Sequence, residues 1–104
     1  MVLISELQVS SIDLTITKAK YTEGPDRFDE WYQLIQEKYP NVINIDCSDN
    51  QLTSLICPNA THIDCSGNQL VSLICPNATY IDCSNNQLVS LECPNATYID
   101  CYGN

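Results

Sequence analysis

Seven cysteines are the residues of this 104-residue chain with the most evident chemistry, because thiols can bind zinc or form disulfides. Nine and seven residues alternately separate successive cysteines, whereas structural zinc sites pair cysteines roughly two to four residues apart. An odd count also leaves a disulfide framework incomplete. The pattern predicts free thiols that act as small apolar side chains, with no metal site and no cofactor. They form two series that share one constant spacing: Cys47, Cys65, Cys83 and Cys101, then Cys57, Cys75 and Cys93.

Four aspartates repeat with the same spacing: Asp46, Asp64, Asp82 and Asp100. If each lies on a strand, the distance of about 4.8 Å between neighbouring strands brings their carboxylates into one row. Such a row would attract a basic partner, or a hard cation such as Ca²⁺ that prefers oxygen ligands. A flat row offers one carboxylate per strand and no enclosing loop. The basic partner is therefore the favoured interpretation, and we expect no metal site.

The single histidine gives no indication of catalysis. His62 has Asn44, Tyr80 and Tyr98 at the equivalent positions of the other repeats, and no nucleophile repeats beside it. A variable surface position explains this pattern, so we expect that the protein is not an enzyme.

The distribution of charge excludes one class of partner. The formal net charge is −9, and all four basic residues lie within the first 38 positions. The remainder carries acids alone, so it would repel the phosphates of a nucleic acid. The first residues show neither the basic start of a secretory signal nor a membrane-spanning apolar stretch. We therefore expect an intracellular, cytoplasmic protein that binds neither nucleic acid nor membrane.

A single repeated unit positions all of these side chains. The triplet Ile-Asp-Cys begins at four evenly spaced positions, namely Ile45, Ile63, Ile81 and Ile99. Similarity at a fixed period indicates a solenoid, in which each turn buries its apolar face against its neighbours. Isoleucine and cysteine lie two positions apart, so on a short strand both point into the core. A left-handed β-helix is the rival fold, but stepping by six residues would place glutamines at its inward positions, at Gln51 and Gln69.

Within one unit the framework positions read Ala60-x-x-Ile63-x-Cys65-x-x-Asn68-x-Leu70-x-x-Leu73. This spacing resembles the leucine-rich repeat family, with Ala and Cys in place of two leucines. The resemblance covers residues 42–104. It implies a repeat solenoid of the leucine-rich-repeat type, in the right-handed β/α superhelix class, with short parallel strands on the concave side. Repeats of 18 residues fall below the family's usual length of about 20–29, so the convex side should lack helices. Short Cys- and Asn-rich repeats of this kind are similar to those of bacteria and large DNA viruses.

The resemblance also implies that a protein ligand binds the concave face. Tyr and Ser are typical of recognition surfaces, although polar side chains there could equally serve only to solvate the face. We expect a protein-interaction module whose partner presents a basic segment. The candidate binding residues are Asp46, His62, Asp64, Tyr80, Asp82, Tyr98, Asp100 and Tyr102.

One asparagine per repeat has a predicted structural role. Its amide can satisfy backbone donors and acceptors of neighbouring turns, which would form a ladder along the solenoid. These residues are Asn50, Asn68, Asn86 and Asn104.

The chain is expected to form a single domain, 1–104, in which residues 1–41 precede the repeats. A degenerate first strand is predicted there, because Val9, Ile12, Leu14 and Thr17 have the spacing of the repeat. A helix over about 25–38 should cap the N-terminal end, since Phe28, Trp31, Leu34 and Ile35 have helical spacing. Residues 42–104 then hold three full repeats and a partial fourth.

No comparable cap is seen after the last repeat, which reaches Asn104. An exposed strand edge invites pairing with another chain. We therefore expect that the C-terminal edge can form a homodimer. The alternative function is a structural or self-assembling module with no specific ligand.

Overall fold

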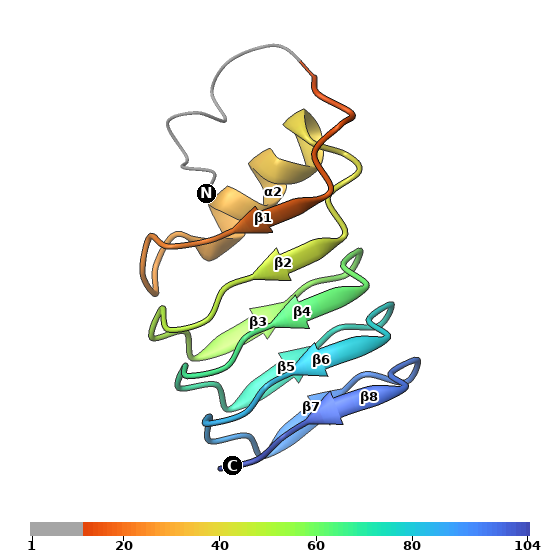
Figure 1. Cartoon of the computed structure of the whole chain (residues 1–104). Coiled ribbons are helices and arrows are strands. Elements are labelled where there is room, and N and C mark those ends of the chain that lie inside the picture. Colours follow the sequence, from red (N-terminus) through yellow and green to blue (C-terminus); the bar gives the residue numbers. More distant parts are fainter. Residues whose placement is uncertain (1–11) are drawn as a thin grey trace.

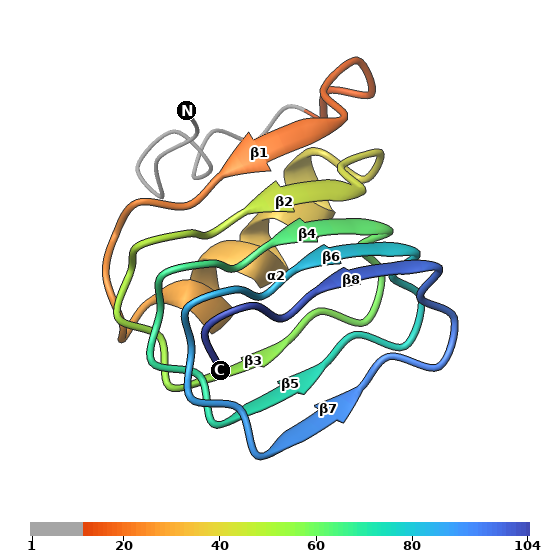
Figure 2. The ribbon, with the colours of Figure 1, turned by 60° about the horizontal axis from the view of Figure 1, so that its bottom comes forward.

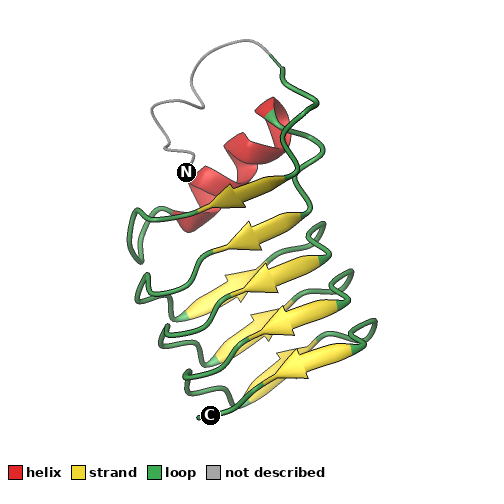
Figure 3. Cartoon of the chain, viewed as in Figure 1, coloured by secondary structure: helices red, strands yellow, loops and turns green. Residues whose placement is uncertain are grey.

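The computed structural model describes residues 12–104, which wind into a solenoid of about three turns built from short parallel strands (Figure 1). From β2 to β7 each turn carries a strand on each of two sides (Figure 3). The five-stranded sheet contains, in order, β1 (Lys18–Lys20), β2 (Asn44–Asp46), β4 (His62–Asp64), β6 (Tyr80–Asp82) and β8 (Tyr98–Asp100). The three-stranded sheet contains β3 (Ser54–Ile56), β5 (Ser72–Ile74) and β7 (Ser90–Glu92).

Each repeat lies in register with the next, so residues of the same kind stack along the solenoid. Ile45 pairs with Ile63, which lies opposite Ile81 in turn, and Leu55 pairs with Leu73 in the other sheet. The predicted repeat solenoid is confirmed, because each strand pairs with the equivalent strand of the next repeat. The side opposite the five-stranded sheet carries strands, and no helix, from β3 to β7.

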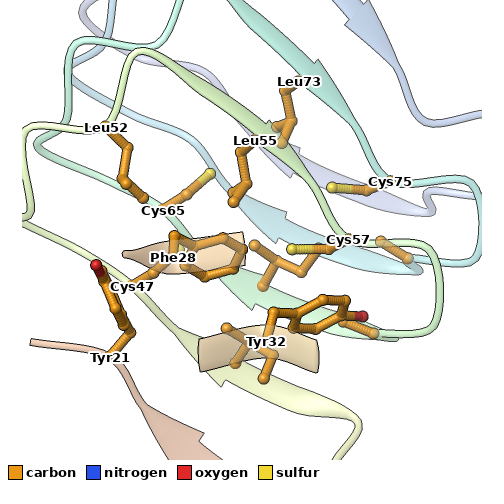
Figure 4. Close-up of a cluster of buried hydrophobic side chains, with 14 of the residues drawn as sticks. Tyr21, Phe28, Tyr32, Cys47, Leu52, Leu55, Cys57, Cys65, Leu73 and Cys75 are labelled. Atoms are coloured by element: carbon orange, nitrogen blue, oxygen red, sulfur yellow. The ribbon is translucent and has the colours of Figure 1, made fainter. Parts of the chain in front are cut away.

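The core lies between the two sheets and is filled by thiols and by the inward-pointing middle residues of strands β1 to β6 (Figure 4). All seven cysteines are free. Five of them are buried, whereas Cys93 is half-buried and Cys101 is exposed, because both belong to the last turn. The thiols of the interior turns therefore pack as small apolar groups.

The turns after the strands of the five-stranded sheet require a left-handed backbone. Asp49, Gly67 and Asn85 occupy equivalent positions in successive turns, with φ of 57°, 66° and 56°. A β-carbon on Gly67 would lie 2.1 Å from Oδ1 of Asp49, so the aspartate side chain fills the space that glycine leaves. Asn and Asp tolerate this conformation better than other residues do, which explains the residue types found in this column.

A helix, α2 (Phe28–Lys38), takes the place of a strand in the first turn. The chain between β1 and β2 is longer than the chain between β2 and β4, which leaves room for the helix. The helix lies beside β3, on the side away from β5 (Figure 2). Its buried face consists of Phe28, Trp31, Tyr32 and Ile35.

The first strand does not lie where the repeat spacing predicts it. The structure places β1 at Lys18–Lys20, with Ala19 opposite Ile45, whereas Ile12 and Leu14 are 67% and 60% exposed. Val9, the first residue of the predicted strand, lies outside the described residues.

Aromatic rings explain this difference in position. Tyr21 follows β1 as Cys47 follows β2, and its ring lies 5.2 Å from the rings of both Phe28 and Trp31. In later turns an isoleucine and a cysteine fill the core. In the first turn the rings of Tyr21, Phe28 and Trp31 occupy that space, so the strand position equivalent to Ile45 holds only the small Ala19.

No helix among residues 12–104 has the length and apolar character needed to cross a membrane.

Candidate binding face on the five-stranded sheet

Three aromatic rings form a column on the outer face of the five-stranded sheet. His62 begins β4, Tyr80 begins β6 and Tyr98 begins β8. The ring centroids of His62 and Tyr80 lie 5.8 Å apart, and those of Tyr80 and Tyr98 lie 4.6 Å apart with only 5° between the ring planes. This stacking follows directly from the register, since neighbouring strands lie about 4.8 Å apart. We call these three residues the aromatic column.

The two tyrosines of the aromatic column present much of their surface to solvent. Tyr80 is 41% exposed and Tyr98 is 49% exposed. The partial burial of Tyr80, followed by the nearby Tyr98 and Asp82, raises the pKa of its hydroxyl above the ordinary value. A tyrosine hydroxyl is protonated at neutral pH even at its ordinary pKa, so Tyr80 can donate a hydrogen bond.

The four repeated aspartates end β2, β4, β6 and β8, and they form one row beside the aromatic column. Oδ1 of each carboxylate accepts the backbone N–H two residues later, at 3.0–3.1 Å, which fixes the side chain in an Asx turn. In the first three turns the serine hydroxyl also donates to this oxygen, at 2.7 Å. We call Asp46, Asp64, Asp82 and Asp100 the aspartate row.

A cation of the chain itself already contacts the first carboxylate of the aspartate row. Lys20 lies opposite Asp46 in the register, and its Nζ is 4.0 Å from Oδ2 of that aspartate. The Asx turn uses Oδ1, so the second oxygen can face an ammonium group. The chain has no lysine or arginine after Lys38, so Asp64, Asp82 and Asp100 have no such partner within the repeats.

Seven of the eight predicted binding residues lie in the aromatic column or the aspartate row. The eighth, Tyr102, lies in the turn after β8 and is 80% exposed. Its N–H donates to Oδ1 of Asp100 at 3.0 Å, in the place that serine takes in earlier turns. Tyr102 therefore lies beside the face but does not extend the aromatic column.

The repeated asparagines bind successive turns together beneath this face. Nδ2 of Asn68 donates to the carbonyl of Cys65 in its own turn at 2.9 Å and to that of Cys47 in the preceding turn at 3.0 Å. Its Oδ1 accepts the N–H groups of Asn50 and Leu52 at 2.9 and 3.0 Å. Its Nδ2 also donates to the carbonyl of Ser66 at 3.3 Å, so this one side chain bonds to five backbone groups of two turns.

The same arrangement continues to both ends of the described solenoid. Asn50 donates to the carbonyl of Tyr21 at 2.8 Å and accepts the N–H of Gly24 at 3.1 Å, which ties the first turn to the repeats. Asn86 accepts the N–H of Leu70 at 2.9 Å and donates to the carbonyl of Cys65 at 3.0 Å, and Asn104 donates to the carbonyl of Cys83 at 2.9 Å. Among residues 12–104, no buried side-chain nitrogen or oxygen lacks a hydrogen-bond partner.

Two further ladders of hydrogen bonds had no counterpart in the sequence analysis. Hydroxyls of Thr79 and Thr97 donate to the carbonyl of the equivalent threonine in the preceding turn, at 3.3 and 3.1 Å. Amides of Asn77 and Asn95 donate to the preceding turn's proline carbonyl, at 2.7 and 2.8 Å. The sequence feature that could have predicted both ladders is the tetrapeptide Pro-Asn-Ala-Thr, which is identical in three successive repeats.

The thiols of Cys47, Cys65 and Cys83 are poor nucleophiles, whereas a hydrogen bond with Cys57 lowers the pKa of the Cys75 thiol. Burial raises the pKa of the Cys47 and Cys65 thiols far above the usual range and that of Cys83 to about 11. Within the described part of the chain, no three His, Cys, Asp or Glu side chains are arranged to hold a metal ion. The arrangement can present aromatic rings and carboxylates to a ligand.

A comparison of the chain with protein-family models, curated proteins and solved structures found no match in any of the three.

Proposed function

We propose that this chain is a non-enzymatic, protein-binding solenoid of the leucine-rich-repeat type. Its partner is an extended peptide segment rich in lysine or arginine, held on the outer face of the five-stranded sheet. The chain needs no cofactor for this role. Its seven free thiols suit a reducing compartment, and we place the protein inside the cell.

The pair formed by Lys20 and Asp46 is the observation that carries this proposal. It provides an internal example of an ammonium group seated beside the aspartate row, with Nζ 4.0 Å from Oδ2. Asp64, Asp82 and Asp100 repeat the same Asx turn and are likewise half-buried. Lysine or arginine side chains of a partner would lie beside these aspartates as Lys20 lies beside Asp46.

The aromatic column supports the same class of ligand. Tyrosine offers rigid contact area with little rotamer entropy to lose, and the stacking with His62 and Tyr98 already orients Tyr80. A cation over a tyrosine ring gains about 0.5–1 kcal/mol at an exposed site. Rings beside carboxylates therefore favour lysine and arginine over neutral side chains.

A fluorescence-anisotropy titration with labelled peptides tests the proposal. A lysine-rich peptide should bind, and a peptide of equal length with glutamate at the lysine positions should not. Replacing Asp82 and Asp100 by Asn keeps the Oδ1 acceptor of each Asx turn and removes only charge. This double variant should bind the lysine-rich peptide about tenfold more weakly and with a smaller dependence on salt.

Substitutions on the two sheets complete the experiment. Tyr80→Ala should weaken binding, whereas Ser54→Ala, an exposed change on the three-stranded sheet, should leave it unchanged. Equal binding of both peptides, or equal affinity of the Asp82→Asn/Asp100→Asn variant and the parent chain, would contradict the proposal.

A further inference from the structure

The outer face of the five-stranded sheet changes the sign of its charge at one strand. In β1 the two outward-pointing residues are Lys18 and Lys20, and both are exposed. The register places Lys18 opposite Asn44 and Lys20 opposite Asp46. The outward positions of β2, β4, β6 and β8 carry the aspartate row, the aromatic column and Asn44, with no lysine or arginine. The lysines of β1 are therefore the fixed positive charges on the described strands of this face.

The charge of one of these two lysines is already paired. Nζ of Lys20 lies 4.0 Å from Oδ2 of Asp46, so this lysine neutralises the first carboxylate of the aspartate row. Lys18 forms no ion pair with a carboxylate in the described part of the chain. The outward residues of β1 and β2 together thus keep one positive charge. Those of β4, β6 and β8 keep one negative charge per strand, so the face is positive at one side and negative over the rest.

Given the proposed function, this asymmetry constrains the sequence of the partner. A basic segment that lies over Asp64, Asp82 and Asp100 cannot continue its cations over β1, because like charges repel there. An acidic side chain at that point would instead contact Lys18 and Lys20, which lie two positions apart and so on the same side of one strand. Two strand spacings of about 4.8 Å separate β1 from β4. Roughly three residues of extended chain span this distance.

We propose that the basic segment bound to this face, as set out under the proposed function, also carries an acidic residue about three positions beyond one end of its basic run. Lys18 and Lys20 bind the carboxylate of that residue. They fix the direction in which the segment lies, since the acid reaches them in one orientation only. They also discriminate against a uniformly basic segment, because such a segment would bring a further cation to Lys18.

Fluorescence anisotropy at low ionic strength, with three labelled peptides of equal length, tests this inference. All three carry the same run of lysines, and the first has glutamine at the position three residues beyond each end of the run. The second has glutamate at the N-terminal one of these two positions, and the third has glutamate at the C-terminal one. One of the two glutamate peptides should bind about three- to fivefold more tightly than the glutamine peptide, which is the gain expected from one exposed ion pair. The chain has a formal net charge of −9, so attraction between net charges alone predicts the opposite order.

A single substitution in β1 shows whether the lysines cause this preference. Lys18→Gln leaves the pair of Lys20 with Asp46 intact and should abolish the preference for glutamate. It should bind the glutamine peptide at least as tightly as the parent chain does, which also shows that the variant is folded. Lys38→Gln removes an equal charge from α2, which lies beside β3 and away from this face (Figure 2). This matched control should keep the preference.

The possible results distinguish a failure of this inference from a failure of the proposed function. If none of the three peptides binds the parent chain, both are overturned. If all three bind and the glutamine peptide is held as tightly as either glutamate peptide, the roles of Lys18 and Lys20 are overturned and the basic partner is not. A preference that survives Lys18→Gln, or one that Lys38→Gln removes equally, would also overturn the inference.

Discussion

Single amides hold the turns of this protein together. An interior repeat supplies one buried asparagine, and that side chain bonds to backbone groups in two turns. A buried backbone N–H or C=O without a partner destabilises the folded state by more than one hydrogen bond stabilises it. The asparagine is therefore needed because it bonds to the backbone groups that the fold buries. Aliphatic side chains cannot take its place because they have neither a donor nor an acceptor, and a thiol is only a weak donor and a weak acceptor.

Replacement of Asn68 by Ala should therefore lower the free energy of unfolding by about 1–3 kcal/mol, because it leaves backbone groups of Asn50, Leu52 and Cys47 without partners. Urea denaturation followed by circular dichroism measures this change. Asn77→Ala is the matched control, since the Asn77 amide is held by a single carbonyl near solvent and its loss should cost less. Equal costs for the two substitutions would show that the buried amide has no special role.

At the scale of elements, α2 replaces a strand that the first turn lacks. Its aromatic face packs towards the core, and the helix lies along the edge of β3 that faces away from β5. Trp31 is fully buried, and its ring lies close to those of Tyr21 and Phe28. A further contact joins the hydroxyl of Tyr32 to the N–H of Asn59 at 3.2 Å.

Trp31→Ala should lower the free energy of unfolding by about 3–5 kcal/mol, because it leaves a large cavity between α2 and the first two turns. Thermal and urea denaturation both report this loss. Gln33→Ala, an exposed change in the same helix, should alter stability by less than about 0.5 kcal/mol. A small effect of Trp31→Ala would indicate that the repeats are stable without the helix.

The elements differ in how far the sequence predicts them, and β1 shows why. The positions of strands β2, β4, β6 and β8 could be predicted, because the same sequence unit occurs four times and the copies can be aligned with one another. The first turn has no such internal comparison, and spacing alone favoured Ile12 and Leu14 over Ala19. What decides the position of β1 is the volume of Tyr21 and the rings of α2, which is a property of tertiary contacts and not of spacing.

The candidate site was predictable in the same uneven way. The aromatic column and the aspartate row could be found from the repeat, because stacking follows from register. The contact of Lys20 with Asp46 could not, since it depends on the true position of β1. The Asx turn that fixes each carboxylate depends on Oδ1 geometry that residue type alone does not determine.

At the scale of the whole molecule, two sheets enclose columns of thiols. Burial raises the pKa of Cys47 and Cys65, and it raises that of Cys83 to about 11 and that of Cys93 to about 12. Burial also raises the pKa of Tyr21 and Tyr32, which pack within the same core. All of these groups hold their protons more tightly when the chain is folded.

The free energy of unfolding should therefore fall as the pH rises above about 9. A thiol whose pKa is raised by folding contributes its stability fully below its unfolded pKa, which is 9.0 for cysteine, and loses it as the pH rises through the folded value. For Cys83 this interval runs from 9.0 to about 11. Urea denaturation at a series of pH values between 7 and 11, with a reductant present, measures the decline. Cys83→Ala should flatten that decline relative to the parent chain, whereas Ser54→Ala, a surface change on β3, should not. A free energy of unfolding that stays constant up to pH 11 would mean that the thiols are not enclosed between the two sheets.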